Sequence, residues 1–312
     1  MATLRSIIST CLLGLALAAS AVPIQVLATG DMHGWLEPQP AGERWLGGAA
    51  EMLACWKRVE GYKPERFLVL SCGDTATGPV LSTVFRNDPV IEVMNLMGYD
   101  ASVVGNHEFD YGLEALARWR KAATFPFLAA NLTQADGTPT DLAPFVINDE
   151  QGVKVAVIGL TVAELNAIAN TGGLQAQAYL ATLRKTVPEA RKQGAQVIIV
   201  NAHTPLAELV ALAKQTADLN IALFLGGHSH EFGQIKVGNA WVVNSGEWWK
   251  GYSRITLDYH AKTGTATVLR AAQVWLLQDT APADPRIKAK IAAWNAKLNA
   301  EYYPSVERDE LI

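Results

Sequence analysis

The chain has 312 residues, of which 50% are hydrophobic and 18% charged, and its formal net charge is -4. This apolar content is high enough to bury a large core, which excludes a chain that is disordered throughout. The weak negative charge, without a run of Lys or Arg, argues against a surface that tracks nucleic acid. Phosphate recognition would therefore need a local site.

The first 21 residues have the pattern of a secretory signal peptide. Arg5 precedes the apolar run IISTCLLGLALAA, which is too short to span a bilayer, and Ala19-Ser20-Ala21 is a small-residue cleavage site. We predict cleavage after Ala21 and export to the periplasm or out of the cell, with no transmembrane segment in the mature protein. An uncleaved anchor is disfavoured because no stop-transfer pattern follows.

Short apolar runs then alternate with amphipathic stretches. The predicted strands are 24–28, 67–71, 101–104, 127–130, 153–160, 197–201 and 221–225. The predicted helices between them are 48–59, 89–97, 113–121, 179–192 and 206–215. A succession of strand, helix and strand predicts a largely parallel sheet covered by helices.

The pattern changes after Gly226. We predict antiparallel strands at 234–237, 240–243, 253–259 and 267–277, joined by turns such as Val237-Gly238-Asn239. A mixed or second sheet follows from them, and residues 285–302 have the pattern of a last helix. Because the chain has no internal repeat or long linker, we expect residues 22–312 to form a single domain.

Two cysteines, Cys55 and Cys72, remain after the predicted cleavage. An exported protein can form a disulfide, and this pair would close a short loop. Two buried, reduced thiols are the alternative, and the sequence leaves both open. Neither cysteine has the spacing of a thiolate metal site.

Polar side chains follow the predicted parallel strands one after another. They are Asp31 and His33 after the first strand, Asp74 after the second, Asn106 and His107 after the third, His203 after the sixth, and His228 and His230 after the seventh. Five of the six histidines lie at such positions, and His260 is the exception. Because ligands bind outside the carboxyl ends of strands in open α/β sheets, we expect these side chains to converge.

This combination of side chains suits divalent metal ions. Imidazole, carboxylate and amide oxygen without thiolate favour Zn, Mn or Fe. Two such ions side by side stabilise both the attacking and the leaving oxygen of a displacement, and one Asp can bridge them. Glycines beside the candidate ligands let the backbone turn sharply; they are Gly30, Gly73, Gly105, Gly226 and Gly227. We therefore expect a centre with two divalent metal ions.

Five short motifs occur in a fixed order: GDMHG, CGDT, GNHEFDYG, NAH and GGHSH. In this order they resemble the motifs of the calcineurin-like metallophosphoesterases. The stretch VIEVMNLMGYDASVVGNHEFDYG is similar to the secreted 5'-nucleotidase branch of that superfamily. The resemblance extends from residue 24 to about residue 260. It implies an α-β-β-α sandwich with two mixed β-sheets.

The resemblance also implies roles for the candidate residues. One metal would be held by Asp31, His33, Asp74 and His230. The other would be held by Asp74, Asn106, His203 and His228, with Asp74 bridging the two. A metal-bound hydroxide would attack the phosphorus, and the products would be an alcohol and inorganic phosphate.

In the same family pattern, His107 would stabilise the transferring phosphoryl group or assist the leaving oxygen, and Asp110 would orient it. Asp110 could instead cap the helix that starts near Gly112. We expect Glu108 to be a solvated or supporting side chain, not a ligand. Trp35, Trp248 and Trp249 could form an apolar wall for a leaving group, but such residues more often only pack in the core.

The predicted function is that of an exported dinuclear-metal phosphoesterase acting on small phosphate monoesters. Two-domain 5'-nucleotidases use a C-terminal domain to clamp the base, and this chain ends at Ile312, so we expect that half to be missing. The substrate range then stays open, from nucleotide-like to broad. The alternatives are a cyclic phosphodiesterase or a sulfur-ester hydrolase at the same centre, or a non-catalytic metal-binding module.

Overall fold

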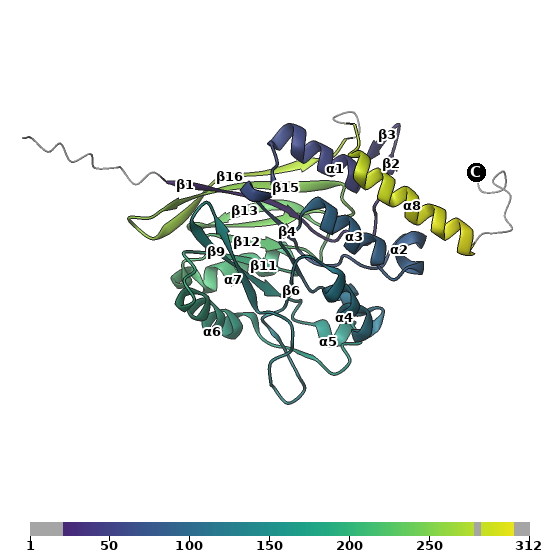
Figure 1. Cartoon of the computed structure of the whole chain (residues 1–312). Helices are drawn as coiled ribbons and strands as arrows, with labels where there is room; N and C mark the ends of the chain where they lie inside the picture. The colour runs from purple at the N-terminus through teal and green to yellow at the C-terminus, as the bar shows by residue number, and fades with distance from the viewer. Residues whose placement is uncertain (1–20, 278–281, 303–312) are drawn as a thin grey trace, which may run out of the picture.

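The structure is a computed structural model that describes residues 21–277 and 282–302 (Figure 1). The predicted signal peptide lies outside the described residues, apart from Ala21. Two 6-stranded sheets form the centre of the described fold. In spatial order, the first sheet consists of β16 (Thr265–Trp275), β15 (Gly251–His260), β1 (Val22–Thr29), β4 (Phe67–Ser71), β5 (Ala101–Val103) and β6 (Phe127–Leu128). The second consists of β13 (Phe232–Val237), β14 (Ala240–Ser245), β12 (Leu223–Gly226), β11 (Val197–Ala202), β9 (Val153–Leu160) and β8 (Phe145–Glu150).

Both sheets are mixed. In the first, β1, β4, β5 and β6 are parallel, and β15 joins β1 antiparallel. In the second, β9, β11, β12 and β14 are parallel, and β8 and β13 are antiparallel at the two edges. Two short antiparallel pairs lie outside these sheets: the hairpin of β2 (Gln39–Ala41) with β3 (Arg44–Leu46), and the pair of β7 (Leu132–Thr133) with β10 (Gln175–Ala176), which are far apart in the chain.

The central parallel strands are apolar runs without alternation because helices or the other sheet cover both of their faces. Every residue of β4, FLVLS, and of β11, VIIVNA, is buried. One set of their side chains packs between the two sheets, where Leu68 and Leu70 of the first sheet meet Val155 and Val157 of the second. The other sets pack under the helices.

The helices form the two outer layers. They are α1 (Ala49–Cys55), α2 (Val80–Val84), α3 (Asp88–Met97), α4 (Gly112–Ala122), α5 (Leu165–Ile168), α6 (Tyr179–Lys192), α7 (Leu206–Gln215) and α8 (Pro285–Tyr302). Three of them, α1, α3 and α4, pack on the first sheet, and α8 packs against α1, α2 and α3, while α6 and α7 cover the second sheet (Figure 1). The predicted α-β-β-α sandwich with two mixed sheets is therefore confirmed. None of the described helices is both long and apolar enough to cross a membrane.

Most predicted elements are present. The short elements α2, α5, β2, β3, β7 and β10 were not predicted, and three further differences concern larger elements. The predicted helix 48–59 changes after Cys55 into a π-helical turn, Trp56–Glu60. Strand β8 was not predicted because its sequence, FVINDE, is partly exposed and ends in polar residues. Strand β14 was predicted as antiparallel; it is antiparallel to β13 but parallel to β12, a pairing between residues that local sequence does not specify.

The two described cysteines form no disulfide. Cys55 and Cys72 are both buried free thiols. The Cys55 sulfur lies 3.6 Å from the Tyr252 hydroxyl, and Cys72 follows β4. Burial raises the pKa of both thiols, so neither has the thiolate character of a reactive cysteine.

The buried carboxyl group of Glu150 should make the stability of the folded protein depend on pH. Burial, with Asp100 and Asp149 nearby, raises the pKa of this carboxyl at the end of β8 from 4.5 to about 7. The folded state therefore binds this proton more tightly than the unfolded state does. The resulting stabilisation is complete below about pH 4.5 and is lost as the pH rises through 7.

We expect Glu150→Gln to unfold in urea with a smaller loss of stability between pH 5 and pH 8 than the unchanged protein. The difference should be on the order of 1 kcal/mol. Glu114→Gln, at an exposed position of α4, is the matched control. An identical pH dependence in the Glu150 variant and the control would contradict the expectation.

Candidate metal centre

The predicted site residues meet where the carboxyl ends of the parallel strands of both sheets come together. From the first sheet come Asp31 and His33 after β1, Asp74 after β4, and Asn106 and His107 after β5. From the second sheet come His203 after β11, and His228 and His230 after β12. The sequence predicted that these residues would meet at the carboxyl ends of the strands of one sheet. In the structure they come from the carboxyl ends of strands in two sheets.

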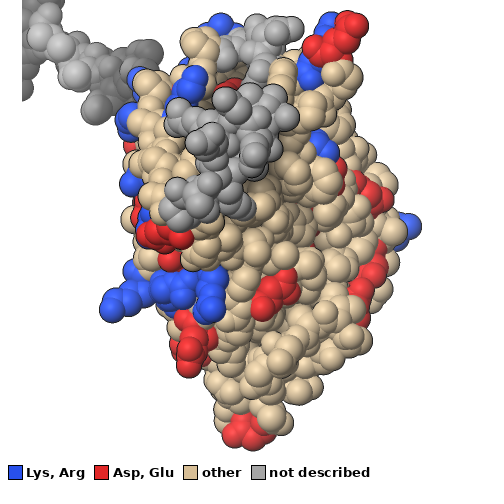
Figure 2. Space-filling view, turned by 90° about the vertical axis from the view of Figure 1, so that its right-hand side faces the viewer, with Lys and Arg blue, Asp and Glu red and all other residues tan. Residues whose placement is uncertain are grey.

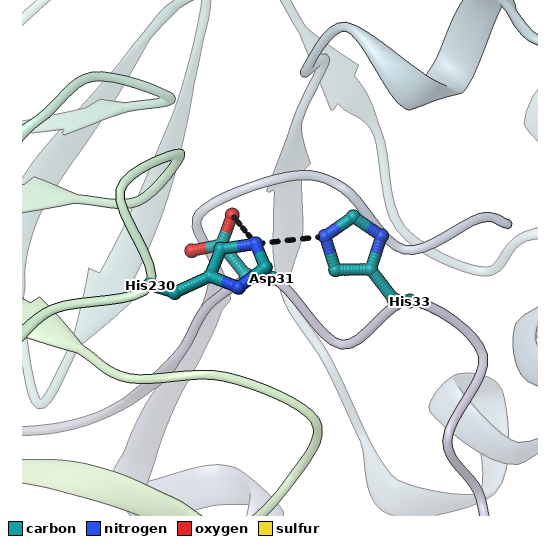
Figure 3. A group of neighbouring side chains, drawn as sticks. All are labelled: Asp31, His33 and His230. Atoms are coloured by element: carbon teal, nitrogen blue, oxygen red, sulfur yellow. Dashed lines mark hydrogen bonds and ion pairs between the residues drawn. The ribbon is translucent and has the colours of Figure 1, made fainter. Parts of the chain in front are cut away.

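One group of side chains consists of Asp31, His33 and His230 (Figure 3). The Nε2 atoms of His33 and His230 lie 3.0 Å apart, and His230 Nε2 is 3.8 Å from Asp31 Oδ1. His33 Nε2 is also 3.8 Å from Asp74 Oδ2. These donor atoms point at one another from three different loops, as ligands of a single ion do.

A second group shares Asp74 with the first. Asp74 Oδ2 lies 3.0 Å from His203 Nε2, and Asn106 Oδ1 lies 3.2 Å from the same nitrogen. His228 completes the group, because its donor atom and those of Asp74 and His203 all lie within 4.8 Å of one another. The same limit holds for His33, Asp74 and His107. One Asp74 oxygen therefore lies between the two groups.

Three of the imidazoles are oriented by hydrogen bonds from Nδ1. His33 Nδ1 donates to the Thr77 carbonyl at 3.2 Å, and His203 Nδ1 donates to the Cys72 carbonyl at 2.8 Å. His230 Nδ1 lies 2.5 Å from Glu247 Oε2. A carbonyl can only accept, so Nδ1 carries a proton in His33 and His203, and Nε2 is the nitrogen that faces the centre.

Glu247 was missed in the sequence. It follows β14 directly, in Ser245-Gly246-Glu247, so the rule that picks polar residues after parallel strands would have found it. The prediction of β14 as an antiparallel strand excluded Glu247 from this pattern. Glu247 also forms an ion pair with Lys250, 2.8 Å away.

The backbone is strained at these positions. Asp31, His33, Asp74, His228 and His230 have φ values of 48°, 43°, 50°, 71° and 58°, in the left-handed region that non-glycine residues rarely adopt. Such residues cluster at functional sites, where the surrounding structure compensates for the strain. Gly105 is needed for space, because a Cβ there would lie 2.3 Å from Asp74 Oδ1.

Asp31 supports a cation at the centre most directly. Its Oδ1 accepts the His228 amide at 2.8 Å, but its Oδ2 is buried without a hydrogen-bond partner. Burial raises the pKa of Asp31 to about 8. A buried carboxylate oxygen without a donor is costly unless a positive charge faces it, so the donor set fits a divalent metal ion.

Asp74 and His203 hold each other charged. Both are fully buried, which opposes ionisation, but their contact lowers the pKa of Asp74 well below its ordinary value. For His203, burial alone would lower the pKa. The Asp74 carboxylate outweighs this effect and raises the pKa of His203 to about 10. A metal ion needs the neutral imidazole as its ligand, so metal binding at this position would release that proton.

His107 and Asp110 form a pair at the open side of the centre. His107 Nδ1 lies 2.7 Å from Asp110 Oδ2, and both side chains are about one-third exposed, at 35% and 32%. The hydrogen bond to Asp110 raises the pKa of His107 to about 9. Asp110 also accepts the Thr77 hydroxyl at 2.5 Å. The alternative that Asp110 only caps α4 is wrong, because no side chain caps the N-terminus of this helix.

Glu108 is neither solvated nor a candidate ligand. Its side chain is fully buried, and burial raises its pKa. Its carboxylate accepts the amides of Asp74 at 3.0 Å, Thr75 at 2.7 Å and Gly105 at 2.6 Å. The expectation of a solvated side chain was therefore wrong, while that of a supporting one agrees with these contacts. Glu108 ties the loop after β4 to the loop after β5.

Residues 24–232 match the family of calcineurin-like phosphoesterases. The chain belongs to this family. The match covers the motifs that carried the resemblance in the sequence, and the resemblance is confirmed. The protein is thus a member of a family of phosphoric ester hydrolases.

Named relatives are similar over part of their length. Protein UshA of Salmonella pullorum is 28% identical over 275 residues, which cover 76% of this chain and 49% of the relative. A 5'-nucleotidase precursor of Thermus thermophilus has a TM-score of 0.80 and 25% identity, over 89% of this chain and 59% of that one. The sulfate thiohydrolase SoxB of the same organism has a TM-score of 0.78 at 22% identity, over 89% and 61%. The chain spans about half the length of the curated relatives, and the likeness to SoxB shows the fold alone.

The contact between Glu247 and His230 predicts an effect on metal affinity. We expect Glu247→Ala to weaken divalent metal binding about tenfold to a hundredfold, because the orientation and basicity of the His230 ring depend on this carboxylate. Competition with a chelator measures it. Glu247→Gln should have a metal affinity between those of Glu247→Ala and the unchanged protein. Glu189→Ala, at an exposed position of α6, is the control. Equal affinities in all three variants would contradict the role.

Proposed function

We propose that residues 22–312 form one exported catalytic domain that hydrolyses small phosphate monoesters at two divalent metal ions. The observation that carries the proposal is the Asp74 carboxylate, which lies 3.0 Å from His203 on one side and 3.8 Å from His33 on the other. A buried carboxylate shared between two groups of imidazoles is the arrangement that two adjacent ions require.

In this proposal, one ion would be held by Asp31, His33, Asp74 and His230, and the other by Asp74, Asn106, His203 and His228. Nitrogen and oxygen donors without thiolate fit Zn, Mn or Fe. When bound, two such ions polarise the phosphoryl oxygens and make a nucleophile available near neutral pH. The buried Asp31 oxygen without a partner supports this occupancy.

His107, oriented by Asp110, would donate a proton to the leaving group. The pKa of about 9 keeps the His107 imidazole protonated at neutral pH, and its Nδ1 is engaged by Asp110. The Nε2–H can then donate to a phosphoryl oxygen or to the departing ester oxygen. Its 35% exposure leaves room for a substrate at this position.

Nucleotides are one candidate substrate class. Relatives of the chain include proteins named UshA and 5'-nucleotidase, which supports a nucleotide-like substrate and export to the periplasm or out of the cell. Both are proposals for this chain, since it spans about half of those relatives. Acidic and basic side chains are interspersed on the face in Figure 2, with no continuous basic stripe among its coloured residues, in keeping with a small substrate.

The first test measures phosphate release by the mature protein loaded with Mn or Zn. We expect turnover of nucleoside monophosphates, sugar phosphates or an aryl phosphate, and its loss in Asp74→Ala because neither metal group is then complete. Faster cleavage of cyclic nucleotides would identify a diesterase. No release from a protein with two bound ions would contradict the proposal and favour sulfur-ester hydrolysis or metal binding alone.

A second test separates His107 from the metal ligands. We expect His107→Ala to lower kcat on the order of 10²- to 10⁴-fold, the usual contribution of a proton donor. Its metal content should remain unchanged, as measured by elemental analysis. His260→Ala, at an exposed histidine outside the centre, is the control. Loss of a metal ion in the His107 variant would instead make this residue a ligand.

A further inference from the structure

The three tryptophans near the centre have different environments. Trp249 is 1% exposed, and its indole nitrogen donates to the Tyr99 hydroxyl at 3.0 Å, so it belongs to the core. Trp35 and Trp248 are only partly buried. Their rings stack on each other with centroids 5.1 Å apart and planes at 25°. The structure thus separates one packing residue from an accessible aromatic pair.

The aromatic pair, Trp35 and Trp248, is attached directly to the candidate metal centre. Trp35 follows His33 by two residues, and the Trp248 amide donates to the Asp31 carbonyl at 2.8 Å. The Trp248 ring stands edge-to-face to the His230 ring, with centroids 6.2 Å apart. A group bound at the metals would therefore have the pair as its neighbour on the His230 side.

The Trp248 ring is held in place from several directions. The Lys250 ammonium lies 3.9 Å from its ring centroid, and Glu247, which orients His230, binds that ammonium at 2.8 Å. The Gln39 side chain donates to the Trp248 carbonyl at 3.2 Å. Among the described residues, Trp35 has no aromatic partner other than Trp248. The face of the Trp35 ring that is turned away from Trp248 is therefore without an aromatic stacking partner in the described chain.

The backbone that carries this ring is strained. Trp248 and Trp249 have consecutive φ values of 55° and 51°, which are unfavourable for bulky residues and would suit glycine or asparagine. A turn of this kind persists only where the surroundings hold it, and such turns concentrate at binding and catalytic sites. Packing explains Trp249, but it does not explain a partly exposed Trp248.

We propose that Trp35 and Trp248 form a stacking wall that selects phosphate esters whose leaving alcohol carries a planar aromatic ring, either the base of a nucleoside or a simple aryl ring. The wall lies within the described chain and needs no further domain. The inference rests on the proposed function for the placement of the phosphoryl group at the metals. Stacking on an aromatic side chain is tolerant of the identity of the ring, so the wall would distinguish aromatic from aliphatic esters and not one base from another.

Steady-state kinetics of phosphate release by the metal-loaded protein test the wall. The aromatic substrates are 4-nitrophenyl phosphate and adenosine 5'-monophosphate, and the aliphatic ones are glycerol 3-phosphate and ribose 5-phosphate. In Trp35→Leu and Trp248→Leu we expect kcat/KM to fall about tenfold or more for the aromatic esters and less than about threefold for the aliphatic ones. Trp248→Phe, which keeps a ring, should retain most of the preference.

Trp241→Leu is the matched control, because Trp241 is also partly buried but lies at the amino end of β14, opposite the centre. A fall for adenosine monophosphate alone would assign the wall to nucleobases, and a fall for both aromatic esters would assign it to aromatic rings in general. Equal losses on all four substrates, or no loss, would overturn the inference.

A measurement without turnover keeps this inference separate from the proposed function. Calorimetry compares binding of phenylphosphonate and methylphosphonate, which have no ester bond to cleave. We expect phenylphosphonate to bind about tenfold more tightly, and the difference to vanish in Trp248→Leu. Absent hydrolysis with this preference intact would refute only the phosphoesterase. Equal binding of the two phosphonates would refute the wall.

Discussion

The carboxylate of Asp74 is the group on which the arrangement of the centre depends. It is 2% exposed, and its Oδ2 lies between His33 and His203, which come from different sheets. Its Oδ1 accepts the His107 amide at 2.9 Å, and its own amide donates to Glu108. A buried negative charge is stable only when positive charge and hydrogen-bond donors surround it closely. The loops after β1, β4, β5 and β11 are therefore fixed relative to one another.

This requirement explains features that are costly elsewhere in a protein. Five of the candidate ligands have left-handed backbones, and Gly105 leaves no space for a side chain beside Asp74. Glu108 is buried and has a raised pKa, yet its carboxylate accepts hydrogen bonds from three backbone amides. These bonds hold the loops after β4 and β5 together. The strain and the buried charge are supported by the sheets beneath, whose central strands β4 and β11 are buried on both faces.

The fold and the chemistry are linked through the loop after β14. Glu247 in this loop orients His230, and Trp248 beside it stacks on Trp35. The same five-residue turn therefore supports a candidate ligand and presents an aromatic surface next to it. A 5'-nucleotidase precursor and a sulfate thiohydrolase of Thermus thermophilus have nearly equal TM-scores to this chain, 0.80 and 0.78. The fold by itself therefore does not identify the substrate.

The sequence by itself determined the strands and the polar residues that follow them, because hydrophobic runs and their ends are local properties. Strands β4 and β9 were predicted to the residue, and all the candidate ligands were found at strand ends. Only the tertiary structure decided which strands pair. It divided the parallel strands between two sheets, placed β14 parallel to β12, and so brought Glu247 to His230. It also buried Glu108 and separated Trp249 from Trp35 and Trp248. These outcomes depend on contacts between residues far apart in the chain, about which local periodicity carries no information.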